Sequence, residues 1–226
     1  MQEILTKIMP NVFTKPADLY NSFLQTLYMM FASGIVSFLF GLILGVILIV
    51  TSPNGILKNK FIYTLLDNLV NIFRSIPFVI LLAALIPLTR AIMGSAIGTK
   101  GALLPLVFGT VPFFTRQIES ALAEVDKGLI EAAESMGSSP TEIIFRVYLR
   151  ESFPGIIRAT QITFISLIGL TAMAGAIGGG GLGDYAIRYG HQRGQTDVTY
   201  ITVLIILLMV SLIQGIGSLL IKRTTH

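Results

Sequence analysis

The chain has 226 residues, of which 53% are hydrophobic and 12% charged, and its mean hydropathy is +0.78. Soluble domains carry about a quarter charged residues, so this composition excludes an ordinary soluble fold and predicts an all-α integral membrane protein. Cysteine is absent, and His191 and His226 are the two histidines, so disulfides are excluded and no metal or cofactor is expected. The net charge of +4 lies mostly beside apolar runs, which indicates membrane anchoring rather than nucleic-acid binding.

Five apolar stretches are long enough to cross a bilayer, which takes about 20 residues in a helix. They are 22–50, 61–88, 102–118, 156–177 and 200–221. Residues 1–21 lack a short apolar core with a cleavage site, so we do not expect a removable signal peptide. Nine Lys and Arg residues fall on the side of the 119–155 segment and six on the other, with Arg74 left out. This excess predicts that the segment and the C-terminus are cytoplasmic and the N-terminus is outside.

The first expected span carries small residues every four positions, at Ser33, Ser37, Gly41 and Gly45. Residues four apart lie on one helix face, and small side chains there let another helix approach closely. The alternative is that serine and glycine are simply common in membrane helices. We expect a packing face.

The second expected span has a polar face, formed by Asp67, Asn71 and Arg74 with Asn68 and Ser75 beside them. Charged groups at membrane depth usually face a helix bundle or water. An interfacial helix whose Arg74 reaches the lipid headgroups explains the pattern equally well. We also expect prolines to interrupt the helices at four positions, Pro77, Pro87, Pro105 and Pro112.

The segment between the third and fourth spans concentrates charge and predicts two helices outside the bilayer. Leu129, Ile130, Ala133 and Met136 fall on an apolar face, and Gly137 can end the first helix in a left-handed conformation. Ser139, Pro140 and Glu142 then predict an N-cap, a first helical residue and a capping box. A helix lying on the lipid surface is the alternative, but such helices are usually rich in Lys and Arg.

The same segment resembles the cytoplasmic loop motif of ABC importer permeases. The matching residues are Glu131, Ala132, Ala133, Gly137, Val147 and Leu149. The sequence departs from the motif at Arg150, where the pattern has proline; Pro154 follows four residues later. Together with "RSIPFVILLAALIPLTR" (74–90), "GLTAMAGAIGGGGLGDYAIRYGHQR" (169–193) and "TLYMMFASG" (26–34), the chain resembles the methionine ABC importer permease family from Leu24 onward.

This resemblance implies a type I ABC importer permease fold with five transmembrane helices per subunit, working as a homodimer. It also implies two copies of a separate ATPase on the cytoplasmic side and an external substrate-binding protein. Residues 1–226 would then form one permease domain, with a coupling loop at about 119–155. The residues implied in ATPase coupling are Glu131, Ala132, Ala133, Gly137 and Leu149.

The chain itself lacks the G-x-x-x-x-G-K-[ST] pattern of a phosphate-binding loop. Gly178–Gly183 has no such lysine or hydroxyl, and we expect it to form a flexible outer turn where helices or a partner approach closely. ATP hydrolysis is therefore expected from a separate protein, and catalytic residues are not expected here.

A possible substrate path runs along the fourth span, where Ser166, Gly169, Thr171 and Met173 interrupt the aliphatic residues. Packing between helices explains the same residues, so both readings stay open; the family resemblance favours Met173 at the dimer axis.

Three other functions remain as alternatives. One is an importer permease for another small polar or amino-acid substrate. A second is a self-contained secondary transporter or channel that uses the Asp67–Arg74 face as an ion route, although no inverted repeat is visible. A membrane enzyme using His191 and Asp184 is the third, but no nucleophile motif accompanies those residues.

Overall fold

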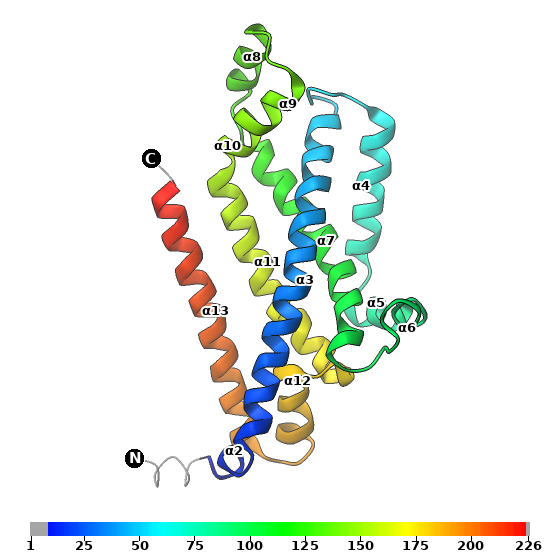
Figure 1. Ribbon diagram of the computed structural model, residues 1–226, viewed down its shortest axis with the longest axis vertical. Helices are drawn as coiled ribbons and strands as arrows, with labels where there is room; N and C mark the ends of the chain where they lie inside the picture. The colour runs from blue at the N-terminus through cyan, green and yellow to red at the C-terminus, as the bar shows by residue number, and fades with distance from the viewer. Residues whose placement is uncertain (1–8, 225–226) are drawn as a thin grey trace. The chain divides into compact units, whose positions relative to one another are not determined.

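The structure is a computed structural model that describes residues 9–224, and the described part is built from helices (Figure 1). Lys7, which entered the charge count, lies outside the described residues. The helices, in chain order, are α2 Pro10–Thr14, α3 Pro16–Thr51, α4 Lys60–Ser75, α5 Phe78–Ala84, α6 Ile86–Met93, α7 Gly98–Ala123, α8 Lys127–Ser135, α9 Pro140–Ile143, η1 Ile144–Tyr148, α10 Leu149–Glu151, α11 Phe153–Ala174, η2 Gly175–Gly179, α12 Gly181–Asp184, η3 Tyr185–His191 and α13 Thr196–Thr224.

Within the described residues, three helices are long and apolar enough to cross a membrane, covering Pro16–Thr51, Phe153–Gly179 and Thr196–Thr224. The number rises to five if two bent pairs each count as one span. The pair α4 and α5 is bent by 102°, and the pair α6 and α7 by 119°. The expected spans at 22–50, 156–177 and 200–221 are therefore confirmed, in longer form.

The expected interruption of the second span at Pro77 is confirmed, because α4 ends at Ser75 and α5 begins at Phe78. Ile76 leaves the helical conformation with φ −83° and ψ 121°, because the ring of Pro77 disfavours helical geometry in the residue before it. Pro87 stands in the first turn of α6, where its missing N–H removes no helical hydrogen bond. The expected interruption at Pro105 and Pro112 is wrong, since α7 continues past both. Proline is tolerated inside membrane helices where local adjustments satisfy the freed carbonyls.

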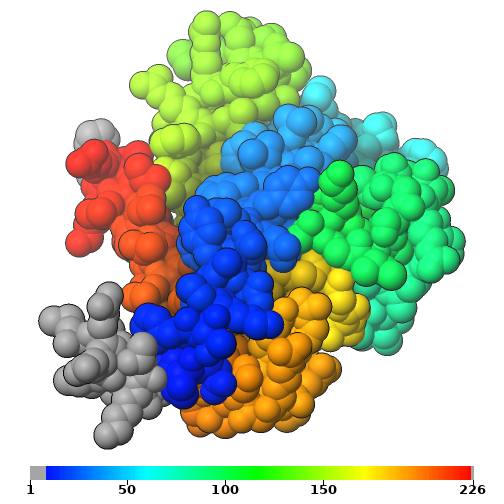
Figure 2. Space-filling model, turned by 60° about the horizontal axis from the view of Figure 1, so that its bottom comes forward, coloured from blue at the N-terminus to red at the C-terminus, as the bar shows by residue number. Residues whose placement is uncertain are grey.

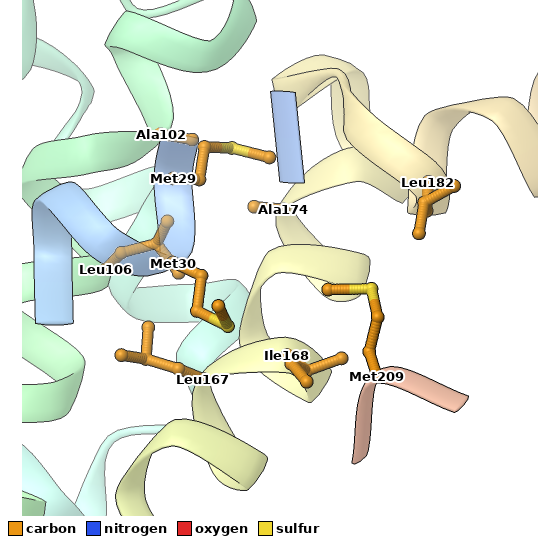
Figure 3. Packing of buried hydrophobic residues seen from close by; sticks show 9 residues of the cluster. All are labelled: Met29, Met30, Ala102, Leu106, Leu167, Ile168, Ala174, Leu182 and Met209. Carbon is orange, nitrogen blue, oxygen red and sulfur yellow. The ribbon is translucent and has the colours of Figure 1, made fainter. Parts of the chain in front are cut away.

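Contacts divide the chain into two compact units. The described residues of unit 1 are 9–35, 77–108 and 164–213, and those of unit 2 are 36–76, 109–163 and 214–224. The core of unit 1 contains three methionines among aliphatic side chains from α3, α7, α11, α12 and α13 (Figure 3). Its buried members are Met29, Met30, Ala102, Leu106, Leu167, Ile168, Ala174, Leu182 and Met209. Methionine is flexible and polarizable, so it fills the irregular spaces between crossing helices.

The glycine-rich segment of unit 1 packs against the beginning of α3, as Figure 2 shows for the orange and blue segments. Gly180 and Gly181 have φ of 76° and 77°, a conformation that glycine adopts without strain. The N–H of Gly181 donates to Gln25 Oε1 at 2.8 Å, and the N–H of Leu182 donates to Thr26 Oγ1 at 2.8 Å. The expected close approach is confirmed, but the segment is a hydrogen-bonded, largely buried element rather than a loose turn.

The predicted small-residue face of α3 is confirmed by burial. Ser33 and Ser37 are 0% and 1% exposed, and Gly41 and Gly45 are buried in unit 2. A Cβ on Gly41 would lie 2.6 Å from Phe114 Cδ1, and one on Gly45 would lie 2.6 Å from Ile118 Cγ2. These glycines therefore set the distance between α3 and α7 within unit 2.

Replacing Gly45 with alanine is expected to lower the thermal stability of the protein in detergent. The added methyl group meets Ile118 and the backbone of Thr115, and such overpacking costs about 1–3 kcal/mol. Gly215→Ala in α13 is the matched control, because a Cβ there has no atom within 4 Å. Equal melting temperatures for the two variants would contradict the packing role of Gly45.

Candidate functional site: the 119–155 loop

The first loop helix, α8, is capped at both ends by its own sequence. Asp126 is the N-cap, and its carboxylate accepts a hydrogen bond from the Gly128 N–H at 2.8 Å. At the other end Gly137 has φ 79°, the Gly137 N–H donates to Glu134 O at 2.9 Å, and the Ser138 N–H donates to Ala133 O at 3.0 Å. This pair of bonds is a Schellman motif, which satisfies the last carbonyls of the helix. The predicted left-handed Gly137 is confirmed.

The second loop helix begins with the predicted capping box. The Glu142 N–H donates to Ser139 Oγ at 3.4 Å, and the Ser139 N–H donates to Glu142 Oε2 at 2.9 Å. Hydrogen bonds from the backbone and then the hydroxyl of Ser139, followed by the charge of Arg146, hold the pKa of Glu142 below its usual value. The box fixes the direction in which the chain leaves the Gly137 turn.

A shared core anchors both loop helices to the ends of α7 and α11. Its buried members from α8 to α10 are Ala133, Ile143 and Tyr148, which are 5%, 2% and 4% exposed. Leu149 packs against this core as a partly buried residue. Burial, and then the nearby carboxylate of Glu134, raise the pKa of the Tyr148 hydroxyl. Ala133 and Leu149, both implied in coupling, thus lie on the inner side of the loop and position it.

The predicted apolar face of α8 is divided between the loop core and the surface. Ala133 and Ile130 turn inward, whereas Leu129 and Met136 are 46% and 79% exposed. The two residues flank the exposed Glu131 and Ala132, so α8 presents small, acidic and apolar groups together. A helical wheel assigns the apolar stripe but does not show how much of it the rest of the chain covers.

The outer surface of the loop is acidic and carries exposed apolar side chains. Residues 119–155 contain seven Asp and Glu residues and three Lys and Arg residues, although the whole chain has a net charge of +4. Phe145 is 69% exposed, on the helical segment that follows the Ser139 cap. A hollow of about 330 Å³ beside the base of α8 includes Glu124, Asp126, Glu151 and Arg158 in its lining. The loop thus exposes apolar side chains beside acidic ones, a composition that protein-binding surfaces can share. The pattern of the sequence did not reveal Phe145.

The departure from the loop motif at Arg150 leaves the return to the membrane intact. Arg150 lies in α10, and the helix axis breaks two residues later at Ser152, which is 5% exposed. The Ser152 hydroxyl donates to Tyr148 O at 2.6 Å, and Pro154 stands in the first turn of α11, where proline is tolerated. The break that the motif assigns to proline is made here by Ser152 and Pro154.

The predicted polar face of α4 is split. Asp67 and Asn71 contact Arg116 of α7, whose guanidinium also pairs with Glu119 at 2.6 Å. Arg74 is exposed. The sequence pattern did not identify Arg116 as the centre of this cluster. The spacing of Arg116 and Glu119, three residues apart on a helix, was the available signal.

The residues of the possible substrate path also divide between two faces of α11. Gly169 is exposed, and a Cβ there would meet no atom within 4 Å. Met173, one turn further along the same face, is 50% exposed, and Ser166 is half-buried. Thr171 is 1% exposed and its hydroxyl donates to Ile168 O at 2.8 Å, so it belongs to the packed side. The open face of α11 therefore carries Ser166, Gly169 and Met173.

The structure gives no support to a hydrolytic centre at His191 and Asp184. Asp184 pairs with Arg188 at 2.8 Å, and the imidazole of His191 is exposed on η3. Within residues 9–224, no three His, Cys, Asp or Glu side chains are placed to hold a metal ion.

Several long apolar helices define a multi-pass membrane protein, and a capped, acidic loop lies between two of them. Residues 37–226 match the family model described as "Binding-protein-dependent transport system inner membrane component", and the chain belongs to that family. The probable D-methionine transport system permease protein MetI of Vibrio cholerae is 48% identical over 202 residues, which cover 89% of this chain and 90% of that protein. The methionine import system permease protein MetP of Bacillus subtilis is 45% identical over 95% of this chain and 96% of its own.

Comparison with solved structures leads to the same family of proteins as comparison with these relatives. A chain from the inward-facing MetNI methionine ABC transporter, in its native crystal form, superimposes with a TM-score of 0.92 at 41% identity. The match covers 94% of this chain and 99% of the solved one. A chain of an amino acid ABC transporter at 20% identity has a TM-score of 0.78 and shares the fold. The chain is thus an all-helical membrane permease with the MetI-type fold.

Proposed function

We propose that this chain is the membrane permease subunit of an ATP-driven ABC importer for methionine. The observation that carries the proposal is the 119–155 loop, which matches the coupling motif and exposes Glu131 and Ala132 on a capped helix. Identities of 45–48% to methionine permeases over most of the chain support the substrate. In this proposal residues 1–226 form one permease domain with five transmembrane helices, counting each bent pair as one span.

The proposed assembly contains two copies of this chain, two copies of a separate ATPase on the cytoplasmic side and an external binding protein that delivers substrate. The ATPase pair closes on ATP and opens after hydrolysis. Each loop follows that movement because its inner face is packed on the ends of α7 and α11. The membrane helices then alternate between outward and inward access, as in other switching proteins driven by domain closure.

The exposed groups of the loop indicate the chemistry of the surface that would bind it. Glu131 and the other carboxylates favour basic or N–H groups, and Met136 and Phe145 favour an apolar pocket. Ala132 allows the partner's backbone to come close. Gly137 and Leu149 act from behind this surface by holding its shape.

Glu131→Lys is expected to lower ATP-dependent methionine uptake by about tenfold or more, which corresponds to about 1.4 kcal/mol. The change reverses the charge at the exposed centre of α8 without disturbing its caps. The measurement is uptake into vesicles that contain the complete complex, with Glu131→Gln as the milder control. Wild-type uptake and wild-type ATPase assembly in the lysine variant would contradict the docking role of Glu131.

The proposed orientation places the loop and the C-terminus in the cytoplasm and the N-terminus outside. Because the sequence has no cysteine, single cysteines report without background. A cysteine at Ser138 is expected to react with an impermeant thiol reagent only in opened cells, and one at Gln195 in intact cells. The reverse pattern would invert the topology and place the loop away from any cytoplasmic ATPase.

Transport assays in vesicles also distinguish the proposed function from its main alternative, a self-contained secondary transporter. Methionine accumulation by the purified chain alone, driven by an ion gradient without ATP, would support the alternative. Accumulation that requires the ATPase and ATP supports the proposal. If another amino acid is taken up faster than methionine, the chain is still an ABC importer permease, but its main substrate is that amino acid.

A further inference from the structure

The polar cluster that joins α4 to α7 within unit 2 is the part of the molecule that the proposed function leaves unused. Arg116 is its centre, with a side chain 18% exposed, and it makes polar contacts with three residues. Its guanidinium pairs with Asp67, donates to Asn71 Oδ1 at 2.9 Å and pairs with Glu119 Oε2 at 2.6 Å. A planar guanidinium can serve several acceptors at once, which an ammonium group does less well.

The hydrogen-bonding capacity of Asp67 is largely used inside the cluster. One carboxylate oxygen accepts from Arg116, and the other accepts from Asn71 Nδ2 at 3.2 Å. The backbone carbonyl of Asp67 also lies 3.4 Å from the guanidinium of Arg116. Both carboxylate oxygens of Asp67 are thus bonded to groups within the cluster. The cluster is therefore better suited to holding two helices together than to conducting ions.

The position of the cluster along α7 suggests which movement it controls. Glu119 is the first residue of the 119–155 loop, and α7 ends four residues later at Ala123. Arg116 thus connects the loop-bearing end of α7 to the middle of α4. Separating the two helices would leave partly buried charges without partners, which is costly.

We propose that Arg116 is a positioning residue that makes α4 move together with the docking loop during the transport cycle. The inference rests on the proposed function, since the loop must be the element that the ATPase moves. Asp67 and Asn71 supply the attachment on α4, and Glu119 orients the guanidinium on α7. In the absence of the cluster, the ATPase would still move the loop, but α4 would follow it incompletely.

The test uses pairs of spin labels on cysteines at Thr64 of α4 and Ala123 of α7, both exposed, in a chain that has no native cysteine. In the wild-type complex the distance distribution is expected to stay narrow and unchanged with and without ATP. Arg116→Gln is expected to broaden it and make it depend on ATP. Arg74→Gln, the same change at an exposed position of α4, is the matched control and should resemble wild type.

Transport measurements on the same variants supply the functional readout. Arg116→Gln and Asp67→Asn are expected to lower methionine transported per ATP hydrolysed by about fivefold, within the range of known coupling effects. Arg116→Lys should recover part of that ratio, because lysine retains the positive charge. The recovery should be incomplete, because an ammonium group lacks the planar geometry that serves several acceptors. A purely structural role would instead lower the amount of assembled complex and leave the ratio unchanged.

The two proposals fail in different ways. If wild-type vesicles show no ATP-dependent uptake, the proposed function is wrong, and the distance measurement on the permease alone still reports on the cluster. If wild-type vesicles transport methionine but Arg116→Gln retains the narrow distance and the normal ratio, the positioning role of Arg116 is wrong.

Discussion

Gly137→Val is expected to abolish methionine uptake while the chain still folds into the membrane. Gly137 has φ 79°, and a β-branched residue at such an angle strains the backbone by about 1–3 kcal/mol. No atom lies within 4 Å of a Cβ built on Gly137, so the effect comes from the backbone angle and not from a clash. Relief of that strain would break the bonds from Gly137 to Glu134 and from Ser138 to Ala133, and so turn α8 away from the α9 cap.

The measurement combines uptake in vesicles with co-purification of the ATPase. Gly137→Asn is the matched control, because asparagine tolerates the left-handed conformation better than other side chains, and it should retain most activity. Loss of ATPase binding in the valine variant, with normal membrane levels, is the expected outcome. Normal assembly of the valine variant with its ATPase would mean that the angle between the loop helices has no part in docking.

Met173→Phe is expected to reduce uptake by about tenfold or more while ATP hydrolysis by the complex continues. Met173 is half exposed on the same face of α11 as Gly169, where a Cβ would meet no atom within 4 Å among the described residues. If that face lines the path between two copies of the chain, a rigid aromatic ring blocks the substrate without touching the docking loop. Met173→Leu, which changes volume little, should transport normally.

Thr171→Val distinguishes residues of α11 that line a substrate path from those that only pack between helices. Thr171 is buried and bonded to Ile168 O, so this change should alter thermal stability and leave substrate transport per ATP unchanged. Normal uptake by Met173→Phe, or failure of that variant to assemble, would assign Met173 to helix packing instead.

Local features of the loop were predictable because they depend on a few neighbouring residues. Ser139, Pro140 and Glu142 specify a capping box wherever the chain can form a helix, and Gly137 ends the preceding helix for the same local reason. The length of the apolar stretches also predicted α3, α11 and α13, because a helix of about 20 apolar residues is long enough to cross the hydrocarbon core of a bilayer. The regular spacing of Gly41 and Gly45 predicted a packing face, but it could not predict which residues pack against that face.

Features that depend on tertiary packing were not predictable from the same patterns. The sequence does not show that α7 continues through Pro105 and Pro112 while Pro77 ends a helix, because neighbouring helices decide whether a freed carbonyl finds a partner. Inward burial of Ala133 beside an exposed Met136 depends on how α8 lies on the loop core. Arg116 meets Asp67 only because α4 and α7 pack together, 49 residues apart in sequence.

The caps at Asp126, Gly137 and Ser139 also bear on how fast and how tightly the loop binds. A recognition segment that orders only on contact loses conformational entropy at that moment, of the order of 1–2 kcal/mol per backbone residue. Here the turn and both helix starts are hydrogen-bonded within the chain, so under the proposed function the loop would meet the ATPase already folded. A preorganised surface of this kind associates as a rigid body, and its complex can be released by the partner's own opening without the loop unfolding. In the proposed assembly, such a loop could follow the ATPase through many cycles of ATP hydrolysis without refolding.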